Sequence, residues 1–230
     1  MLWLFLCLMS CQWFYNSDGN QTTVQVFNVS SYNKGIDNSV KSSVKIGCFV
    51  DGDFFSKGSG NYLKSNKHKF VLTAAHVVGH CDEIHLANRH GSIVLGDIVY
   101  QDKEKDVAIV KPRVELSEIE AVQFSLRAKD YTVGERVYFM GHPDELNFFL
   151  FEGLIALEGE DDFFLHSTGW GGVSGAVVFS KKGRVLGIAK AVKVTVNPIT
   201  GLPRLLEDLV LVSKAEFLTK EVLRDSMGDE

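Results

Sequence analysis

The sequence predicts an all-β protein with one helix at its C-terminal end. From position 44 onward, short apolar runs rich in β-branched residues recur between glycine, asparagine, aspartate and lysine; they cover 44–50, 70–73, 92–95, 107–110, 136–140, 176–179 and 185–189. Helical periodicity is almost absent from this region. Many short strands separated by frequent turn signals are typical of a β-barrel or a β-sandwich.

The last segment, 213–227, has a different pattern. Ser213 and Glu216 have the spacing of a capping box, in which a serine and a glutamate three residues later satisfy the first amides of a helix. The apolar residues at 217, 218, 222 and 223 then fall on one helical face. We therefore expect a helix over 213–227 that closes a β-rich body.

Length and composition limit the other possibilities. A chain of 230 residues, 45% of them hydrophobic, fits one domain or two small β-barrels that share a cleft. The formal charge of −5 and the lack of a basic run give no electrostatic basis for binding nucleic acid. Residues 13–40 are polar and are expected to form a linker with one short strand at 23–29. The folded domain is expected to cover 41–230, because no further glycine- and serine-rich linker interrupts it.

Residues 1–12 resemble an export signal. The apolar run Leu2–Met9 is too short to cross a bilayer but long enough for the core of a signal peptide. The following Ser10 and Cys11 complete a segment similar to a lipobox, so lipid attachment at Cys11 is expected. We predict an exported protein of the cell envelope or periplasm, anchored to a membrane through this lipid or otherwise secreted. The alternative is an N-terminal strand or helix that packs on the domain.

Two candidate catalytic residues lie in short local patterns. An apolar strand at 70–73 continues into Thr-Ala-Ala-His, so small residues precede His76 and allow a tight turn that leaves its imidazole at a cleft. Asp106 opens the apolar strand 107–110. Taken alone, a histidine has many structural roles, and an aspartate before a strand is common turn chemistry.

The third pattern, 168–178, carries the strongest signal. Ser174 is flanked by glycines, including Gly172 and Gly175, and an apolar strand follows it. Glycine supplies the backbone conformations that a strained nucleophile turn requires and permits close approach of a substrate. The backbone N–H groups of Gly172 and Ser174 are candidates for an oxyanion hole, in which one donor is worth about 10²–10³ in rate. The same Gly-x-Ser-Gly string alone is equally compatible with a plain β-turn.

Together the three patterns follow the chain order His, Asp, Ser, one of the three known orders of this triad. The sequence is similar to the trypsin-like peptidases of the chymotrypsin (S1) superfamily, most closely to the HtrA/Deg type of catalytic domain. The resemblance covers about 44–212 and rests on Gly58-Ser59-Gly60, 70–78, 106–111, Gly141-His142-Pro143 and 183–188.

The resemblance implies two six-stranded antiparallel β-barrels with the active site in the groove between them, as in chymotrypsin. It implies a serine endopeptidase without a cofactor or metal ion, acting on a polypeptide substrate. Ser174 attacks the scissile carbonyl, His76 takes the proton, and Asp106 orients His76. The amides of Gly172 and Ser174 form the oxyanion hole. No oligomeric state is predicted, and no peptide-sensing domain is expected after the peptidase domain.

The resemblance also assigns the substrate contacts. Thr168 is expected near the base of the primary specificity pocket. Lys190, Ala191 and Val192 are expected to pair with the substrate backbone as an added strand. No aspartate stands where a trypsin binds arginine and lysine side chains, so tryptic specificity is not expected.

Two further features are a pair of cysteines and a departure from the usual serine motif. Cys48 and Cys81 lie on either side of His76 in the chain, and the resemblance to trypsins implies that they form a disulfide. Val173 and Ala176 depart from the usual Gly-Asp-Ser-Gly-Gly-Pro string. These departures support a rival hypothesis, a catalytically inactive relative that binds peptides or proteins in the same cleft. A second rival is a structural envelope lipoprotein.

Overall fold

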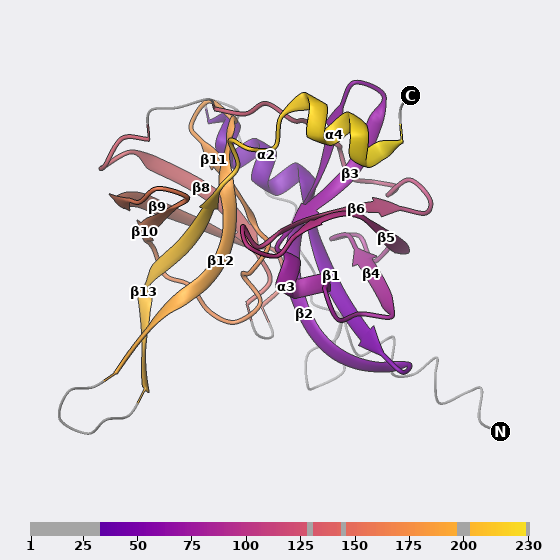
Figure 1. Cartoon of the computed structure of the whole chain (residues 1–230), viewed down its shortest axis with the longest axis horizontal. Helices are drawn as coiled ribbons and strands as arrows, with labels where there is room; N and C mark the ends of the chain where they lie inside the picture. Colours follow the sequence, from indigo (N-terminus) through magenta and orange to yellow (C-terminus); the bar gives the residue numbers. More distant parts are fainter. Residues whose placement is uncertain (1–32, 128–130, 144–145, 197–202, 229–230) are drawn as a thin grey trace.

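The computed structural model describes residues 33–127, 131–143, 146–196 and 203–228. Two β-barrels lie side by side, the first built from the N-terminal half of the chain and the second from the C-terminal half (Figure 1). The predicted leader 1–12 with Cys11 and the predicted strand 23–29 lie outside the described residues. No helix in the described part of the chain is long and apolar enough to cross a bilayer.

The first barrel contains six antiparallel strands and one short addition. In spatial order the strands run β1-β4-β5-β6-β3-β2, and pairing between β1 and β2 closes the barrel. A two-residue strand, β7, adds to β2 in parallel. The bounds are β1 Ser43–Val50, β2 Asp53–Ser65, β3 His68–Thr73, β4 Glu83–Ala87, β5 Ile93–Asp102, β6 Val107–Pro112 and β7 Val122–Gln123.

The second barrel is closed by six antiparallel strands in the order β10-β13-β12-β11-β8-β9. The prediction of two six-stranded antiparallel barrels is therefore confirmed. Closure leaves few exposed strand edges, which otherwise promote association between chains. The bounds are β8 Arg136–Gly141, β9 Phe149–Glu158, β10 Asp162–His166, β11 Val177–Ser180, β12 Val185–Val196 and β13 Pro203–Lys214.

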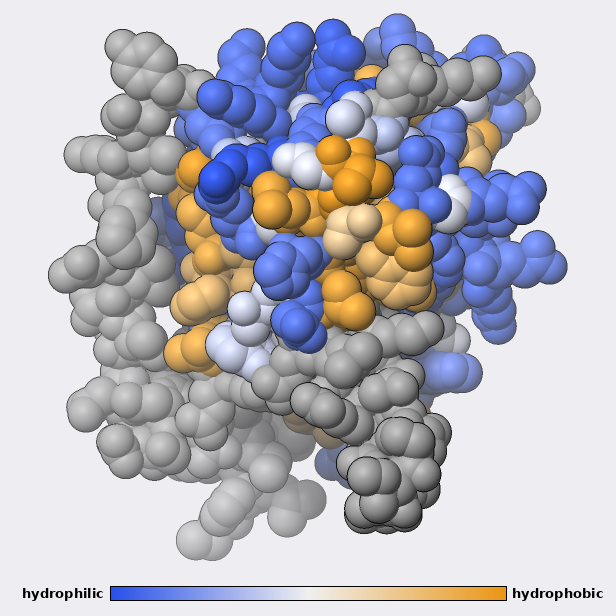
Figure 2. Space-filling view, turned by 90° about the vertical axis from the view of Figure 1, so that its left-hand side faces the viewer, coloured by the Kyte–Doolittle hydropathy of each residue, from blue (hydrophilic) through white to orange (hydrophobic). Residues whose placement is uncertain are grey.

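Alternating burial fills both barrels. On β9, Phe151 and Ile155 point into the second barrel, where they join a core that includes Phe139 and Phe163. Some exposed residues of the same strand are apolar too, and Leu157 is 59% exposed. Figure 2 looks onto this side of the molecule and shows hydrophobic residues gathered among hydrophilic ones. The buried side chains on one face of a strand fix its register, because a shift by one residue would turn them outward.

The C-terminal helix is present but shorter than predicted. Helix α4 covers Lys220–Met227, and Thr219 is its N-cap, accepting from the N–H of Val222. Ser213, the predicted cap, instead belongs to β13 and pairs with strands on both sides. Ladder hydrogen bonds to two neighbouring strands outweigh a local capping pattern, because only the sheet position also buries the flanking apolar residues.

A second helix, α2, covers Lys34–Ser42, within the segment interpreted as a polar linker. The side chain of Asn33 caps its first amides. The helix packs on β8 and β11 of the second barrel. Gly35 permits a close approach, since an added Cβ there would lie 2.4 Å from the carbonyl oxygen of Ser180. The polar composition of this segment reflects one exposed helical face rather than an absence of structure.

Candidate active site

The structure brings His76 and Asp106 together through two hydrogen bonds. His76 lies on α3 (Ala75–Val78), the short helix that follows β3, and Asp106 lies in the turn between β5 and β6. His76 Nδ1 is 2.7 Å from one carboxylate oxygen of Asp106, and the backbone N–H of His76 donates to the other at 2.8 Å. This pairing places the ring proton on Nδ1, so the lone pair of Nε2 is available as a base.

The backbone of Asp106 is held in a conformation that few residues adopt. Its φ is +54°, in the left-handed region where aspartate is better tolerated than most side chains. The turn is fixed from within, since the carboxylate of Asp102 accepts from the N–H groups of Glu104 and Lys105. The strand after the turn, β6, is buried and pairs with β3, which leads to His76. Sheet pairing thus sets the distance between these two residues.

The turn around Ser174 requires glycine at two positions. Gly172 and Gly175 have φ of +94° and +91°, conformations that strain any side chain. At Gly175 an added Cβ would lie 2.0 Å from the backbone oxygen of Ser59 and 2.2 Å from Oγ1 of Thr73. The turn therefore packs directly on the backbone of the first barrel, and this contact places Ser174 at the junction of the two barrels.

Ser59 holds the Ser174 turn, a role that the sequence analysis did not identify. Its backbone N–H donates to the carbonyl of Ser174 at 2.8 Å. Its hydroxyl donates to the carbonyl of Gly172 at 2.7 Å and accepts from the N–H of His142 at 3.1 Å. The resemblance had marked only the Gly58-Ser59-Gly60 segment as a whole. No local signal distinguishes this serine from the others, because its partners lie far away in the chain.

The hydroxyl of Ser174 does not bond His76 in this structure. A Cβ atom added at Gly58 would contact both the side chain of Val77 on α3 and the carbonyl of Ser174. Ser174 therefore lies close to the helix that carries His76. Its Oγ donates instead to the carbonyl of Lys190 at 2.9 Å. A nucleophilic role requires this hydroxyl to turn from Lys190 toward His76 Nε2. Hydrogen bonds of this kind often form only once substrate is bound.

The predicted oxyanion-hole amides are available for a ligand. Within the described residues, the N–H groups of Gly172 and Ser174 have no hydrogen-bond acceptor. The hydrogen bond from the Ser59 hydroxyl fixes the peptide plane that lies between them. Two fixed, unoccupied donors near a serine hydroxyl are what stabilisation of a developing oxyanion requires.

The strand expected to bind substrate has an open edge. β12 pairs with β11 only as far as Ile188, but it pairs with β13 through Val196. Lys190 is the extra residue of a bulge in the β13 pairing, while Ala191 and Val192 pair with β13 on one side only. Their other edge is therefore free, among the described residues, to accept an added strand. Thr168 is exposed in the loop before the Ser174 turn.

Behind the turn, His142 is completely buried. Its Nδ1 accepts from the N–H of Phe148 at 3.0 Å, which puts the ring proton on Nε2, near the hydroxyl of Ser43. Burial and then the positive charge of Lys45 lower the pKa of His142 to about 3. Burial also lowers the pKa of Lys45 to about 8. His142 is therefore a neutral structural group beside the Ser174 turn.

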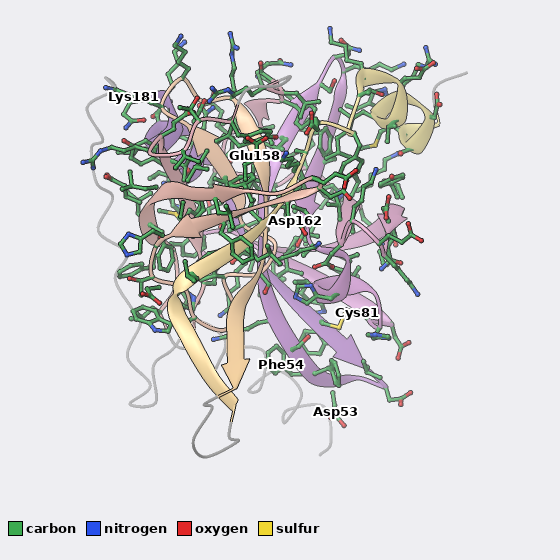
Figure 3. The ribbon with its side chains drawn as sticks, turned by 60° about the vertical axis from the view of Figure 1, so that its left-hand side comes forward. Asp53, Phe54, Cys81, Glu158, Asp162 and Lys181 are labelled. Atoms are coloured by element: carbon green, nitrogen blue, oxygen red, sulfur yellow. A yellow bond between two sulfur atoms is a disulfide. The ribbon has the colours of Figure 1, made fainter. Side chains whose placement is uncertain are left out.

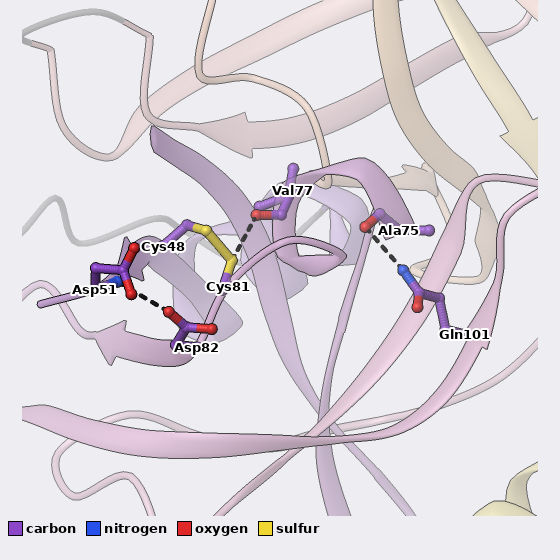
Figure 4. The surroundings of a disulfide bond; sticks show 7 residues. All are labelled: Cys48, Asp51, Ala75, Val77, Cys81, Asp82 and Gln101. Atoms are coloured by element: carbon purple, nitrogen blue, oxygen red, sulfur yellow. Dashed lines mark hydrogen bonds between the residues drawn. A yellow bond between two sulfur atoms is a disulfide. The ribbon is translucent and has the colours of Figure 1, made fainter. Parts of the chain in front are cut away.

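The disulfide implied by the resemblance is present. Cys48 on β1 is bonded to Cys81, three residues after α3, with Cα atoms 5.1 Å apart (Figure 4). On the other side of α3, the side chain of Gln101 donates to the carbonyl of Ala75. The helix that carries His76 is thus attached to the first barrel at both ends.

The two departures from the usual motif are explained by packing. Val173 and Ala176 are both buried in the core of the second barrel, with 3% and 0% of their surface exposed. Neither contributes a polar atom to the site. Their apolar character is what this core position requires.

Comparison with known proteins agrees with this geometry. The family described as trypsin-like peptidase domain matches residues 58–188, more than half of the chain. Among solved structures, the chain is similar to the serine endoprotease from Yersinia pestis, with a TM-score of 0.66 and 21% identity over 87% of this chain and 68% of that chain. At this identity the likeness concerns the fold. A search of the curated proteins found no match.

Proposed function

Because the chain belongs to the trypsin-like peptidase family, we propose that it is a serine endopeptidase with Ser174 as nucleophile. The observation that carries the proposal is the double hydrogen bond between His76 and Asp106, 2.7 and 2.8 Å long, beside a serine on a glycine-strained turn. A side-chain bond alone fixes one ring nitrogen; the added backbone bond also fixes the position of the histidine main chain.

The proposed reaction proceeds through an acyl-enzyme. The Oγ–C bond forms between Ser174 and the scissile carbonyl while His76 Nε2 takes the hydroxyl proton. The oxyanion is stabilised by the amides of Gly172 and Ser174, the C–N bond breaks, and His76 returns the proton to the leaving amine. Water then attacks the acyl carbon by the same route. Asp106 stabilises the imidazolium in both halves without taking up its proton.

A polypeptide substrate is proposed to add to the open edge of β12. The carbonyl of Lys190 points to this edge, since Ser174 Oγ bonds it. The backbone amides and carbonyls beyond the bulge, at Ala191 and Val192, are positioned to extend the pairing. Main-chain pairing gives affinity with little sequence preference, and selectivity is proposed to depend on a primary specificity pocket expected near Thr168.

One observation favours the alternative, a binding protein without activity. The Ser174 hydroxyl is engaged with Lys190, and no hydrogen bond joins it to His76 within the described part of the chain. A protein that kept this arrangement when peptide bound would use the β12 edge for recognition alone.

Labelling with a fluorophosphonate probe distinguishes the two functions. We expect wild-type protein to react and the Ser174→Ala and His76→Ala variants not to react. Circular dichroism on all three proteins controls for folding. A folded wild-type protein that stays unlabelled at probe concentrations sufficient for known serine peptidases contradicts the enzyme and leaves peptide binding as the function.

We further propose that the protein works outside the cytoplasm, either as a lipoprotein attached through Cys11 or in free form. The disulfide between Cys48 and Cys81 supports this, because such bonds persist in oxidising compartments. The intact mass after expression in a bacterium tests the proposal. Cleavage before Cys11 with an added lipid mass supports anchoring, and an unprocessed N-terminus contradicts export.

A further inference from the structure

We infer that Ser213 and the Asp162–Lys190 ion pair are positioning residues that connect the two halves of the proposed active site. The inference rests on the proposed function and adds residues that the triad pattern does not contain. All three lie on the second barrel, on β13, β10 and β12. Asp162 is near the middle of the molecule, where the two barrels approach each other (Figure 3).

Ser213 contacts the turn that carries Asp106. The hydroxyl of Ser213 makes a short hydrogen bond to the carbonyl of Lys105, the residue before Asp106. Ser213 is 1% exposed, so water does not reach this site freely. Loss of the hydroxyl would therefore leave the buried carbonyl of Lys105 without its donor, at a cost in free energy. The bond fixes the peptide plane between Lys105 and Asp106, which determines where the left-handed Asp106 residue directs its carboxylate.

Asp162 lies between Ser213 and Lys190 and contacts both. The single proton of the Ser213 hydroxyl is shared between the carbonyl of Lys105 and Oδ1 of Asp162, which lies 3.2 Å away, and the same Oδ1 accepts from Nζ of Lys190 at 3.1 Å. The ion pair is largely screened from water, with 17% of the Lys190 side chain and 31% of the Asp162 side chain exposed. A pair this buried is held more firmly than an exposed one, and loss of one partner leaves an uncompensated charge.

The main chain of Lys190 contacts the proposed nucleophile, Ser174. The main-chain carbonyl of Lys190 accepts the hydroxyl of Ser174. Lys190 is the bulged residue of β12, so ladder pairing alone does not fix its carbonyl. The ion pair with Asp162 restrains Lys190, the residue whose carbonyl Ser174 contacts. The polar contacts thus run from Lys105, beside Asp106, through Ser213, Asp162 and Lys190 to Ser174.

Loss of the Ser213 hydroxyl is expected to displace the carboxylate of Asp106 while the barrels stay folded. Small displacements of a catalytic group reduce rates by up to about 100-fold. For Ser213→Ala we expect a loss of about 10- to 100-fold in the rate of fluorophosphonate labelling, and Ser213→Thr is expected to restore it. Ser39→Ala is the matched control, because Ser39 is also buried and its hydroxyl also donates to a backbone carbonyl, that of Gly35 in α2.

The ion pair offers a second, independent variant. Asp162→Asn keeps the side-chain shape and removes the charge that holds Lys190, so labelling should slow. Glu158→Gln is its control, since Glu158 forms the neighbouring ion pair, with Lys214 in place of Lys190. Both acidic residues are labelled in Figure 3. If Ser213→Ala does not fold, equal labelling rates for these two variants overturn the inference.

A second readout does not depend on activity. The proton on His76 Nδ1 can be observed by NMR in histidine-labelled protein and assigned by its absence in His76→Ala. We expect this signal to broaden or disappear in Ser213→Ala and to persist in Ser213→Thr and Ser39→Ala. An unchanged signal and labelling rate in Ser213→Ala refute the inference. If wild-type protein is not labelled, the proposed function fails, and the NMR signal alone decides whether Ser213 positions Asp106.

Discussion

The buried His142 predicts a stability that falls as the solution becomes acidic. The pKa of this ring is about 3 in the folded protein, against 6.5 for an ordinary histidine. Between these values the unfolded chain binds a proton that the folded protein excludes. Protons therefore favour unfolding, and the free energy of unfolding rises with pH throughout this window.

The size of the effect follows from the two pKa values. Integration from pH 7 to pH 5 gives a loss of about 2 kcal/mol from His142 alone. The positive charge of Lys45 already contributes to this low pKa, and Lys45, whose own pKa is about 8, stays protonated at both pH values, so its titration adds nothing to the difference. For a domain of this size, about 2 kcal/mol corresponds to a shift of about 4–8 °C in the unfolding midpoint.

Urea unfolding at pH 7 and pH 5 measures the effect, with His142→Asn compared with wild type. Asparagine can accept from the N–H of Phe148 but does not titrate. We expect the variant to be less stable at pH 7 and to lose about 2 kcal/mol less than wild type on acidification. His166→Asn is the control, since His166 is exposed at the end of β10, and it should follow wild type. A His142→Asn variant with the same acid-induced loss as wild type would refute the reasoning.

Four further changes test the site and its supports. Gly175→Ala should abolish fluorophosphonate labelling and lower the thermal midpoint, because its Cβ would overlap a backbone oxygen; normal labelling would contradict the packing. Asp106→Asn should leave circular dichroism unchanged and reduce kcat about 10⁴-fold, as expected for a wrong histidine tautomer. Ser59→Ala should slow labelling about 10-fold or more through a less ordered oxyanion turn, whereas an unchanged rate would exclude that role. Replacing Cys48 and Cys81 by alanine should cost about 3–4 kcal/mol in urea unfolding, from a crosslink that spans 33 positions.

The sequence predicted the β-rich body and the three candidate catalytic motifs because both leave local patterns, whereas the two-barrel architecture was implied by the resemblance. β-Branched runs between turn residues reveal strands one at a time, and Asp106, His76 and Ser174 each occupy a short motif with a chemical reason for its composition. The disulfide between Cys48 and Cys81 could be inferred only by resemblance, and the structure confirms it. For each strand and each catalytic motif, the information lies within about ten neighbouring residues.

The supports of the site are different, because they depend on strand register. Ser213 fitted a helix cap in its local sequence, yet the pairing of β13 with β10 and β12 places its hydroxyl on a turn 108 positions earlier in the chain. Ser59 likewise meets Gly172 across 113 positions. Nothing in the sequence next to a serine indicates such a contact. Shifting a strand by one residue would move its side chain to the opposite face of the sheet, so the role exists only once the barrel has closed.

This difference predicts where the function is most easily lost without loss of the motifs. A change at Ser59, Ser213 or Asp162 leaves the His76, Asp106 and Ser174 patterns intact, and a reading of motifs alone would still predict a peptidase. Geometry would nevertheless be affected, because Ser59 and the proposed positioning residues Ser213 and Asp162 hold parts of the site rather than transfer protons. In a chain of this family, the three motif residues therefore indicate the chemistry, while the contacts between the two barrels determine whether that chemistry can proceed.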